Sequence, residues 1–270
     1  LKTTTKDSPP PMGTVAKALS LLDFFNRSRS TIGLSELARL SGFNKATVHR
    51  LLTELQAQGF VEQTGSAREY RLGPAFLRLA ALREAAVPMR DLAQTVLADL
   101  SAETHETTHV SLTQGDTLVT LTYAYAPLHG TRVTMEDAEQ LTFHNTASGL
   151  AVLAFSPPEF THAMLARPLE KRTSLTVTDP ATIRATLTRV RETGMSQCVG
   201  GFEDDVHSHA MPLFDSDTRV IGAIAVAAPS ARMTPEHQAL IRRALRHHGL
   251  RLTRLMGGFL PDGFQREEAA

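Results

Sequence analysis

The most concentrated chemical groups in this 270-residue chain lie in one short run, Glu203-Asp204-Asp205-Val206-His207-Ser208-His209. On an extended strand alternate side chains share a face, so His207 and His209 point the same way. Two imidazoles with a third ligand from Glu203, Asp205 or His144 make the donor set of a zinc site. The same groups suit polar contacts to a bound small molecule, acid and base catalysis, or simple solvation in a loop. The spacing alone leaves all four interpretations open.

A second run of polar side chains follows Asn44, a residue type that caps helices. Apolar residues recur from Val48 to Leu55 at three- and four-residue spacing, which predicts a helix with one buried face that ends at Gly59. No acidic residue interrupts the opposite face of its first half. Its outward side chains, which suit base edges and phosphates, are Lys45, Ala46, Thr47, His49, Arg50 and Thr53.

The neighbouring segments supply the elements that would position this polar face. Apolar residues from Val15 to Phe25 predict a first helix, and a second is expected from Ser35, whose hydroxyl can cap it, to Ser41-Gly42. After the third helix, residues 60–64 and 68–72 flank a polar turn and predict a β-hairpin.

This order of elements is that of a winged helix-turn-helix, in which the third helix reads DNA and the hairpin is the wing. The alternative is a small helical lobe whose basic side chains are merely solvated. The residues expected to contact or position DNA are Ser35, Asn44, Lys45, Ala46, Thr47, His49, Arg50, Arg68 and Arg71.

Charge and composition narrow the classes of protein. Residues 1–73 hold 10 Lys and Arg against 6 Asp and Glu, so the rest holds 18 against 22. The basic first quarter is compatible with nucleic-acid binding. The single Cys198 excludes an intramolecular disulfide and is interpreted as a buried strand residue rather than a redox sensor. Apolar runs such as 221–228 are too short to span a bilayer, and a cytoplasmic protein with no membrane partner is expected.

The larger remainder predicts an α+β domain with a mostly antiparallel sheet. Strands are expected at 107–113 and 117–125 and around Arg132, Cys198 and His209, with helices at 89–104, 146–155, 158–166, 181–193 and 234–256. The expected boundaries are a disordered arm at 1–12, the DNA-binding domain at 13–73, a linker helix at 74–88 and a second domain at 89–260.

Several stretches resemble the IclR family of bacterial regulators, in order along residues 14–255. They are Leu34-Ser35-Glu36-Leu37-Ala38, the run from Lys45 to Leu52, Tyr70-Arg71-Leu72-Gly73, the run from His144 to Gly149, Ala210-Met211-Pro212-Leu213-Phe214-Asp215, Gly222 to Pro229, and Arg232-Met233-Thr234. The resemblance implies a GAF-like or PAS-like effector domain with helices to one side of its sheet. It also implies a homodimer or a tetramer formed as a dimer of dimers, on a palindromic operator.

The resemblance also implies where an effector binds. The helix start near Ser148 offers free amides and a positive dipole end, which favours a carboxylate or another anion. The resemblance and the polar run described first together predict nine effector-binding residues. They are Ala147, Ser148, Gly149, Glu203, His207, Ser208, His209, Ala225 and Ala227.

Three of these positions depart from family members that bind small keto acids. Those members have a Ser-x-Ser pair where this chain has Ala225 and Ala227, and a cysteine where it has Ser208. The less polar pocket predicts a larger or more apolar organic effector, a carboxylate or a lactone, that controls a catabolic operon. A metal-sensing regulator using His207, His209 and Glu203, and an enzyme using Glu203, Asp205 and His207, are the alternatives. We expect no cofactor.

Overall fold

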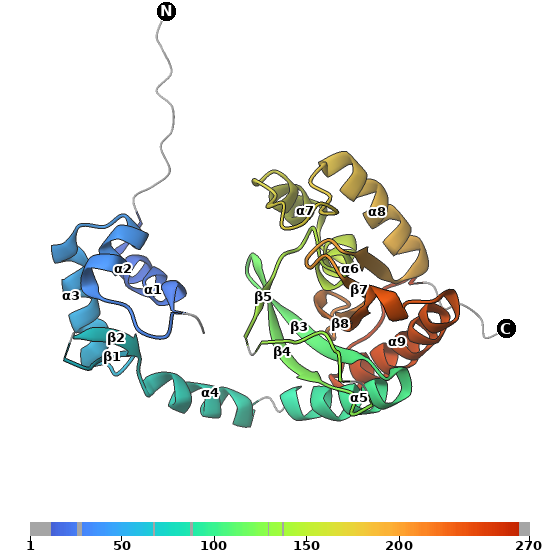
Figure 1. Cartoon of the computed structure of the whole chain (residues 1–270), viewed down its shortest axis with the longest axis horizontal. Coiled ribbons are helices and arrows are strands. Elements are labelled where there is room, and N and C mark those ends of the chain that lie inside the picture. Colours follow the sequence, from blue (N-terminus) through green and yellow to red (C-terminus); the bar gives the residue numbers. More distant parts are fainter. Residues whose placement is uncertain are drawn as a thin grey trace, which may run out of the picture. The chain divides into compact units, whose positions relative to one another are not determined.

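The chain divides into two compact units, residues 1–87 and 88–270, each with its own hydrophobic core (Figure 1). The computed structural model describes residues 12–25, 29–66, 68–86, 89–128, 130–136 and 138–264. The disordered arm expected at 1–12 lies outside these residues, except for Met12, and so do the last two residues of the expected linker helix.

In the described residues, the first unit consists of three α-helices and a 3-10 turn, followed by a hairpin and a further α-helix. The first helix was expected to continue to Phe25, but it ends at Ser20 and Leu22–Phe24 form a separate 3-10 turn. The elements are α1 (Thr14–Ser20), η1 (Leu22–Phe24), α2 (Leu34–Ser41), α3 (Lys45–Ala57), β1 (Val61–Thr64), β2 (Glu69–Leu72) and α4 (Ala75–Ala86).

The core of the first unit confirms the periodicity of α3. Its residues Val48, Leu51, Leu52 and Leu55 are buried, where they join Leu37 of α2. Helix α2 ends at Gly42, which adopts the left-handed conformation (φ 71°) that a glycine takes without strain.

One capping prediction is wrong and one is right. Helix α2 begins at Leu34, after an extended Gly33, so Ser35 lies inside the first turn and its side chain caps nothing. At the start of α3, Asn44 Oδ1 accepts a hydrogen bond from the Thr47 amide at 2.8 Å. That bond satisfies one of the amides that a helix start leaves free.

The hairpin pairs β1 with β2 in antiparallel register, from Val61 opposite Leu72 to Thr64 opposite Glu69. Ile32 pairs with β2 on its other edge. Its amide donates to the Tyr70 carbonyl and its carbonyl accepts from the Tyr70 amide, both at 2.9 Å. The wing is therefore tied to the segment that precedes α2.

The second unit contains a six-stranded antiparallel sheet in the order β5-β4-β3-β8-β7-β6. Its strands are β3 (Thr107–Gln114), β4 (Thr117–Ala124), β5 (Gln140–Leu141), β6 (Ser196–Val199), β7 (Val206–Phe214) and β8 (Val220–Pro229). Its helices are α5 (Met89–Thr104), α6 (Ala147–Phe155), α7 (Pro158–Leu165), α8 (Pro180–Thr193), η2 (Ser230–Arg232) and α9 (Pro235–Leu255). None of the helices in the described ranges combines the length and the apolar character needed to cross a membrane.

The strand expected around Arg132 is absent from residues 130–136, and the short β5 follows that segment. The segment is held instead by side chains from other elements. The Tyr125 hydroxyl accepts from the Met135 amide at 2.9 Å, and the Thr107 hydroxyl donates to the Val133 carbonyl at 2.8 Å. Such contacts between distant residues leave no periodic pattern in the local sequence.

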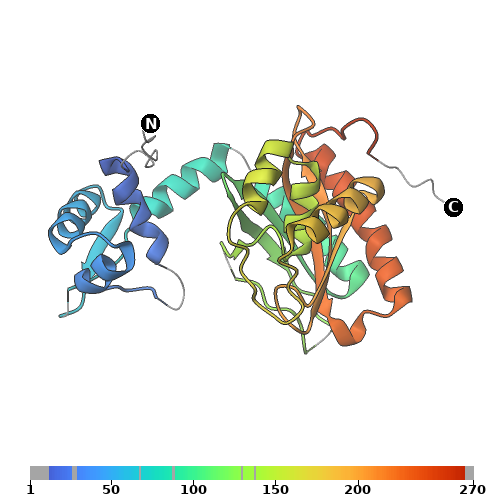
Figure 2. The same ribbon diagram turned by 90° about the horizontal axis from the view of Figure 1, so that it is seen from above.

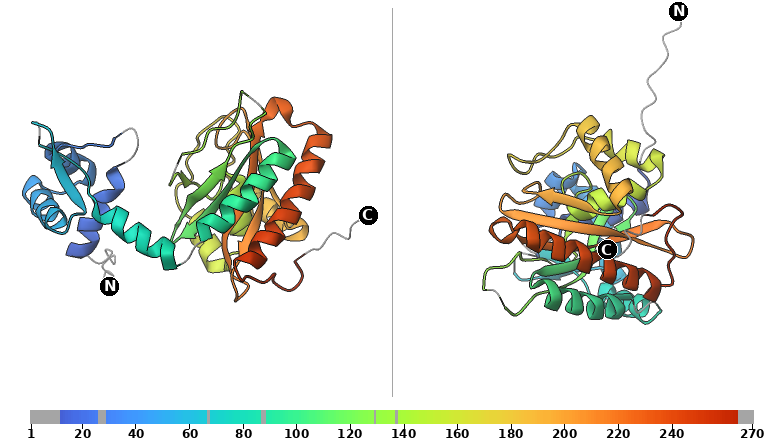
Figure 3. Two further views of the ribbon diagram at one scale, coloured as in Figure 1. Left: turned by 90° about the horizontal axis from the view of Figure 1, so that it is seen from below. Right: turned by 90° about the vertical axis from the view of Figure 1, so that its right-hand side faces the viewer.

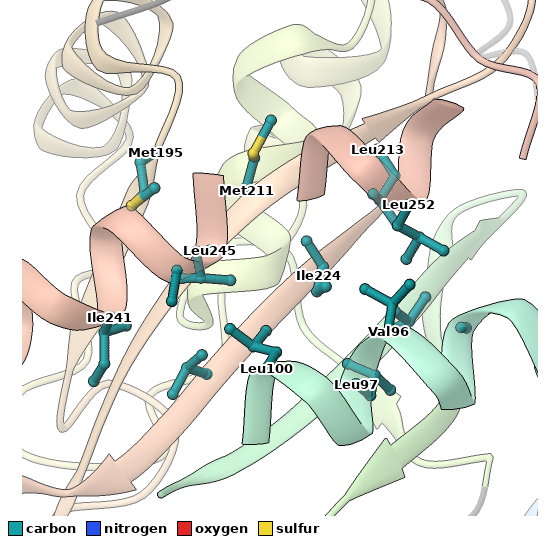
Figure 4. Close-up of a cluster of buried hydrophobic side chains, with 14 of the residues drawn as sticks. Val96, Leu97, Leu100, Met195, Met211, Leu213, Ile224, Ile241, Leu245 and Leu252 are labelled. Carbon is teal, nitrogen blue, oxygen red and sulfur yellow. The ribbon is translucent and has the colours of Figure 1, made fainter. Parts of the chain in front are cut away.

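Helices cover both faces of the sheet, whereas the family resemblance implied only one covered face. Helices α5 and α9 run side by side on one face, and α6 packs between the other face and α8 (Figures 2 and 3). Figure 4 shows the core under α5 and α9, where Leu100 and Leu245 meet Ile224 of β8. Helix α6 is buried on all sides, so its sequence is apolar without a polar stripe.

Candidate functional site

The exposed face of α3 is the candidate DNA-reading surface of the first unit. Lys45, Ala46, His49 and Arg50 are exposed, and Thr47 is half-buried. The buried residues of the same helix hold this face outward. Its first two turns carry no acidic side chain, so the surface presents donors and positive charge to a polyanion.

The two arginines of the wing differ in their environment. Arg68 lies in the turn of the hairpin, exposed and with a left-handed backbone (φ 53°). Arg71 Nε donates to Glu62 Oε1 at 2.7 Å, because the two residues are opposite each other in the hairpin. The Nε of Arg71 is thus engaged by a carboxylate, and its Nη groups are the donors left for a phosphate.

A small cavity of about 50 Å³ lies between the sheet and the start of α6 in the second unit. Its walls combine β-strand residues, the α6 start and the loops before β5 and β7. The lining residues are His109, Val133, Thr134, Met135, Glu139, Leu141, Thr146, Ala147, Ser148, Phe202, Glu203, Val206, Ser208 and Ala227.

The start of α6 is less open than an uncapped helix. The Thr146 hydroxyl accepts from the Gly149 amide at 2.9 Å, so that amide is already bonded. Gly149 itself does not line the cavity but packs against backbone, since a Cβ there would lie 2.4 Å from Phe143 Cα. Ala147 and Ser148 line the cavity, as the family resemblance implied.

His109 of β3 lines the cavity, although no sequence motif singled it out. It is 5% exposed, and its Nε2 lies 3.1 Å from the Ser148 hydroxyl. Burial lowers the pKa of His109 to about 4, which keeps the ring neutral at neutral pH. Its Nδ1 has no hydrogen-bond partner among the described residues. The alternation of side chains in β3 predicts that His109 lies on one face of the strand. It does not predict that α6 covers that face.

His207 and His209 point away from the cavity, because β7 turns alternate side chains to opposite faces. They lie on the face covered by α9, with Met211, whereas Ser208 lines the cavity opposite Ala227 of β8. Ala225 packs in the core beneath α6 instead of lining the cavity. The structure therefore brings Ser208, Ala227 and Glu203 together and leaves both histidines apart from them.

The geometry of the two histidines does not suit a shared metal ion. Their rings are stacked, with centroids 5.0 Å apart and planes inclined by 19°. A metal bound to an imidazole nitrogen lies near the plane of the ring, and two stacked planes share no such point at the Zn–N distance of about 2 Å. Within the described parts of the chain, no three His, Cys, Asp or Glu side chains are grouped to hold a metal.

The buried histidine pair predicts an acid sensitivity of the second unit. Burial, then the charges of His207 and Arg242, lower the pKa of His209 to about 3. An unfolded histidine takes up a proton near pH 6.5, so stability present above that pH is lost as the pH falls toward 3. Between pH 7 and pH 4.5, His209→Leu should therefore lose about 2 to 3 kcal/mol less stability than the unmodified protein. Urea unfolding followed by circular dichroism measures the free energy of unfolding at each pH.

The matched control for that measurement is His247→Leu, which removes an exposed histidine from α9. It should leave the pH dependence unchanged. Because neither ring nitrogen of His209 has a partner among the described residues, its replacement by leucine should not destabilise the protein at pH 7. An acid loss in His209→Leu as large as that of the unmodified protein would contradict this interpretation.

Cys198 lies in β6, half-buried, with its thiol directed to the Asn145 carbonyl at 3.1 Å. Burial raises the pKa of the Cys198 thiol, although a hydrogen bond from the Gly201 backbone opposes the shift. A raised thiol pKa reduces the thiolate that oxidants attack. The environment therefore favours the structural interpretation of this cysteine.

Comparison with known proteins covers both units. The IclR helix-turn-helix domain matches residues 14–65, and the C-terminal domain of the bacterial transcriptional regulator IclR matches residues 83–254. The HTH-type transcriptional regulator XynR of Escherichia coli is 26% identical over 92% of this chain and 98% of its own.

Two solved structures are also similar. An ICLR transcriptional regulator from Silicibacter sp. TM1040 is 59% identical, with a TM-score of 0.90 over 94% of this chain and 100% of its own. An IclR homologue from Microbacterium hydrocarbonoxydans, complexed with 4-hydroxybenzoate, is 24% identical, with a TM-score of 0.73 over 90% of this chain and 100% of its own. With both of its domains matched in order, the chain belongs to the IclR family of bacterial transcriptional regulators.

Proposed function

We propose that this regulator binds a specific DNA operator through α3 and releases or tightens it when a small organic molecule fills the cavity of the second unit. The observation that carries the proposal is the exposed face of the first two turns of α3, which has no acidic side chain and is held outward by a buried core. Lys45, Thr47, His49 and Arg50 enter the major groove. Arg68 and Arg71 contact phosphates or the minor groove.

Operator recognition uses two copies of the chain. One recognition helix reads only a short half-site, so a homodimer, or a tetramer formed as a dimer of dimers, places two helices on a palindrome. Asn44 and Ser35 lie at the starts of α3 and α2. Asn44 fixes the α3 start, and the exposed Ser35 is available to a phosphate.

The effector contacts the residues that line the cavity, among them Ala147, Ser148 and Ser208. A carboxylate and a lactone are the two classes that the sequence favoured for a catabolic regulator. The similar structure from Microbacterium hydrocarbonoxydans contains 4-hydroxybenzoate, which supports an organic ligand for this chain as well. The volume of about 50 Å³ requires the rim loops to move for a ligand of that size.

The test uses a DNA duplex selected by the protein from a random-sequence library. Fluorescence anisotropy then measures how organic acids, lactones and amines change the affinity for this duplex. At least one compound should change the affinity of the unmodified protein, while Ala227→Val, which fills the cavity with two methyl groups, binds the duplex but no longer responds. A compound that acts equally on both proteins would place the effector elsewhere.

A further inference from the structure

The two charged side chains that line the effector cavity at neutral pH are both acidic. Glu139 and Glu203 line it, and no lysine or arginine is among the lining residues. The neutral His109 contributes no positive charge at neutral pH. Arg172 lies outside, with its guanidinium 3.8 Å from the centre of the Phe202 ring.

Glu139 is the better enclosed of the two acids, half-buried where Glu203 is exposed. Burial raises the pKa of Glu139, and the negative charges of Glu203 and Glu136 raise it further. The Glu136 backbone and the Arg172 charge oppose the shift. The protein therefore compensates the charge of Glu139 only in part, and a ligand with positive charge would compensate it further.

A carboxylate ligand meets an unfavourable field in this cavity. The start of α6 supplies about half a positive charge, and one of its amides is already bonded to Thr146. The carboxylates of Glu139 and Glu203 together carry more negative charge than the helix end alone offsets. A carboxylate ligand would therefore be repelled by groups of its own charge.

We propose that the effector is a small protonated amine, such as an amino alcohol, whose ammonium group lies between Glu139 and Glu203. This inference rests on the proposed function and specifies the ligand class of the same site. Besides the acids, the buried His109 lines the cavity, and its Nδ1 has no hydrogen-bond partner among the described residues.

The size and the walls of the cavity agree with this class. A cavity of about 150 Å³ holds benzene, so about 50 Å³ holds only a few non-hydrogen atoms without rearrangement. Met135, Phe202 and Ala227 provide apolar contacts for the carbon atoms. The Ser148 and Ser208 side chains supply further hydroxyls within the same walls.

Calorimetry on the full-length protein can test the charge of the ligand directly. Ethanolamine, ethylene glycol and glycolate have similar size but carry positive, zero and negative charge. Ethanolamine should bind at least tenfold more tightly than glycolate at pH 7, with ethylene glycol between them. Methylammonium and choline extend the positively charged series to smaller and larger ligands.

The variants Glu139→Gln and Glu203→Gln identify the groups responsible. Each should weaken ethanolamine binding by about tenfold or more and reduce the preference over glycolate. Asp204→Asn is the matched control, because it removes the same charge from the exposed neighbour of Glu203 that does not line the cavity. It should leave both affinities within twofold of those of the unmodified protein.

Proton linkage gives an independent readout near pH 5, where a raised Glu139 pKa leaves part of the carboxyl protonated. An ammonium ligand stabilises the charged carboxylate and should release protons on binding, whereas a carboxylate ligand should take protons up. Titrations in two buffers of different ionisation heat measure the sign. The release should disappear in Glu139→Gln.

The outcomes separate this inference from the proposed function. If glycolate or other carboxylates bind more tightly than the amines, and Ala227→Val blocks them, the amine proposal is overturned while the cavity remains the effector site. Failure of every ammonium probe to bind at 50 mM also overturns it. If a ligand binds tightly but Ala227→Val does not affect it, the proposed site fails as well.

Discussion

Replacing Arg232 by alanine should lower the free energy of unfolding of the second unit by about 3 to 5 kcal/mol. Arg232 forms a two-pronged ion pair with Glu106, with Nε 2.7 Å from Oε1 and Nη2 2.5 Å from Oε2. The Glu106 side chain is 1% exposed, so without Arg232 its charge is buried, and among the described residues His237 is the one ion-pair partner that remains, at 3.4 Å. Urea unfolding followed by circular dichroism measures the loss.

An exposed ion pair in the same unit provides the control. Arg167 contacts Asp116 at 2.7 Å, but both side chains are about half exposed, 52% and 55%. Arg167→Ala should cost less than about 1 kcal/mol, because water solvates the remaining carboxylate. Equal losses in the two variants would show that burial of Glu106 does not govern the effect.

The same arginine connects stability to the effector cavity. Its Nη1 donates to the Thr131 carbonyl at 3.0 Å, in the segment that supplies Val133 and Met135 to the cavity. Glu106 lies in the short connection between α5 and β3. Arg232 therefore joins this connection to the segment 131–135 beside the cavity.

Arg50→Ala should weaken binding to the selected duplex by about 10- to 100-fold, which corresponds to about 1 to 3 kcal/mol for a lost base contact. Arg50 is exposed on α3, so its removal should leave the melting temperature unchanged. Anisotropy with a labelled duplex at fixed salt measures the affinity, because phosphate contacts make binding strongly dependent on salt.

Arg184→Ala, an exposed arginine on α8 of the second unit, controls for the loss of one positive charge. It should leave the affinity within about twofold of that of the unmodified protein. If Arg50→Ala and Arg184→Ala bind the duplex equally well, α3 does not read the bases through Arg50.

The reading helix could be predicted from sequence because its determinants are local. The spacing of its buried residues and the Asn44 cap lie within one segment. The predicted Ser35 cap was displaced because the extended Gly33 starts α2 before the serine. The ion pair between Glu62 and Arg71 depends on the hairpin register, which turn composition alone does not determine.

The cavity was only partly predictable. Alternation correctly placed His207 and His209 on one face, but a strand covered by helices on both sides gives no sign of which face meets the ligand. His109 and Glu139 come from segments far from β7 in the sequence. Their contribution depends on strand order and loop conformation, which require the whole fold.

The most direct test of the central claim is the ratio of two dissociation constants at the same salt concentration. One is for the selected duplex, and the other is for a duplex of the same composition with scrambled sequence. A sequence-specific regulator should bind the selected duplex at least about 1,000-fold more tightly, and Arg50→Ala should reduce that ratio. Equal dissociation constants for the two duplexes would contradict the assignment of α3 as a DNA-reading helix.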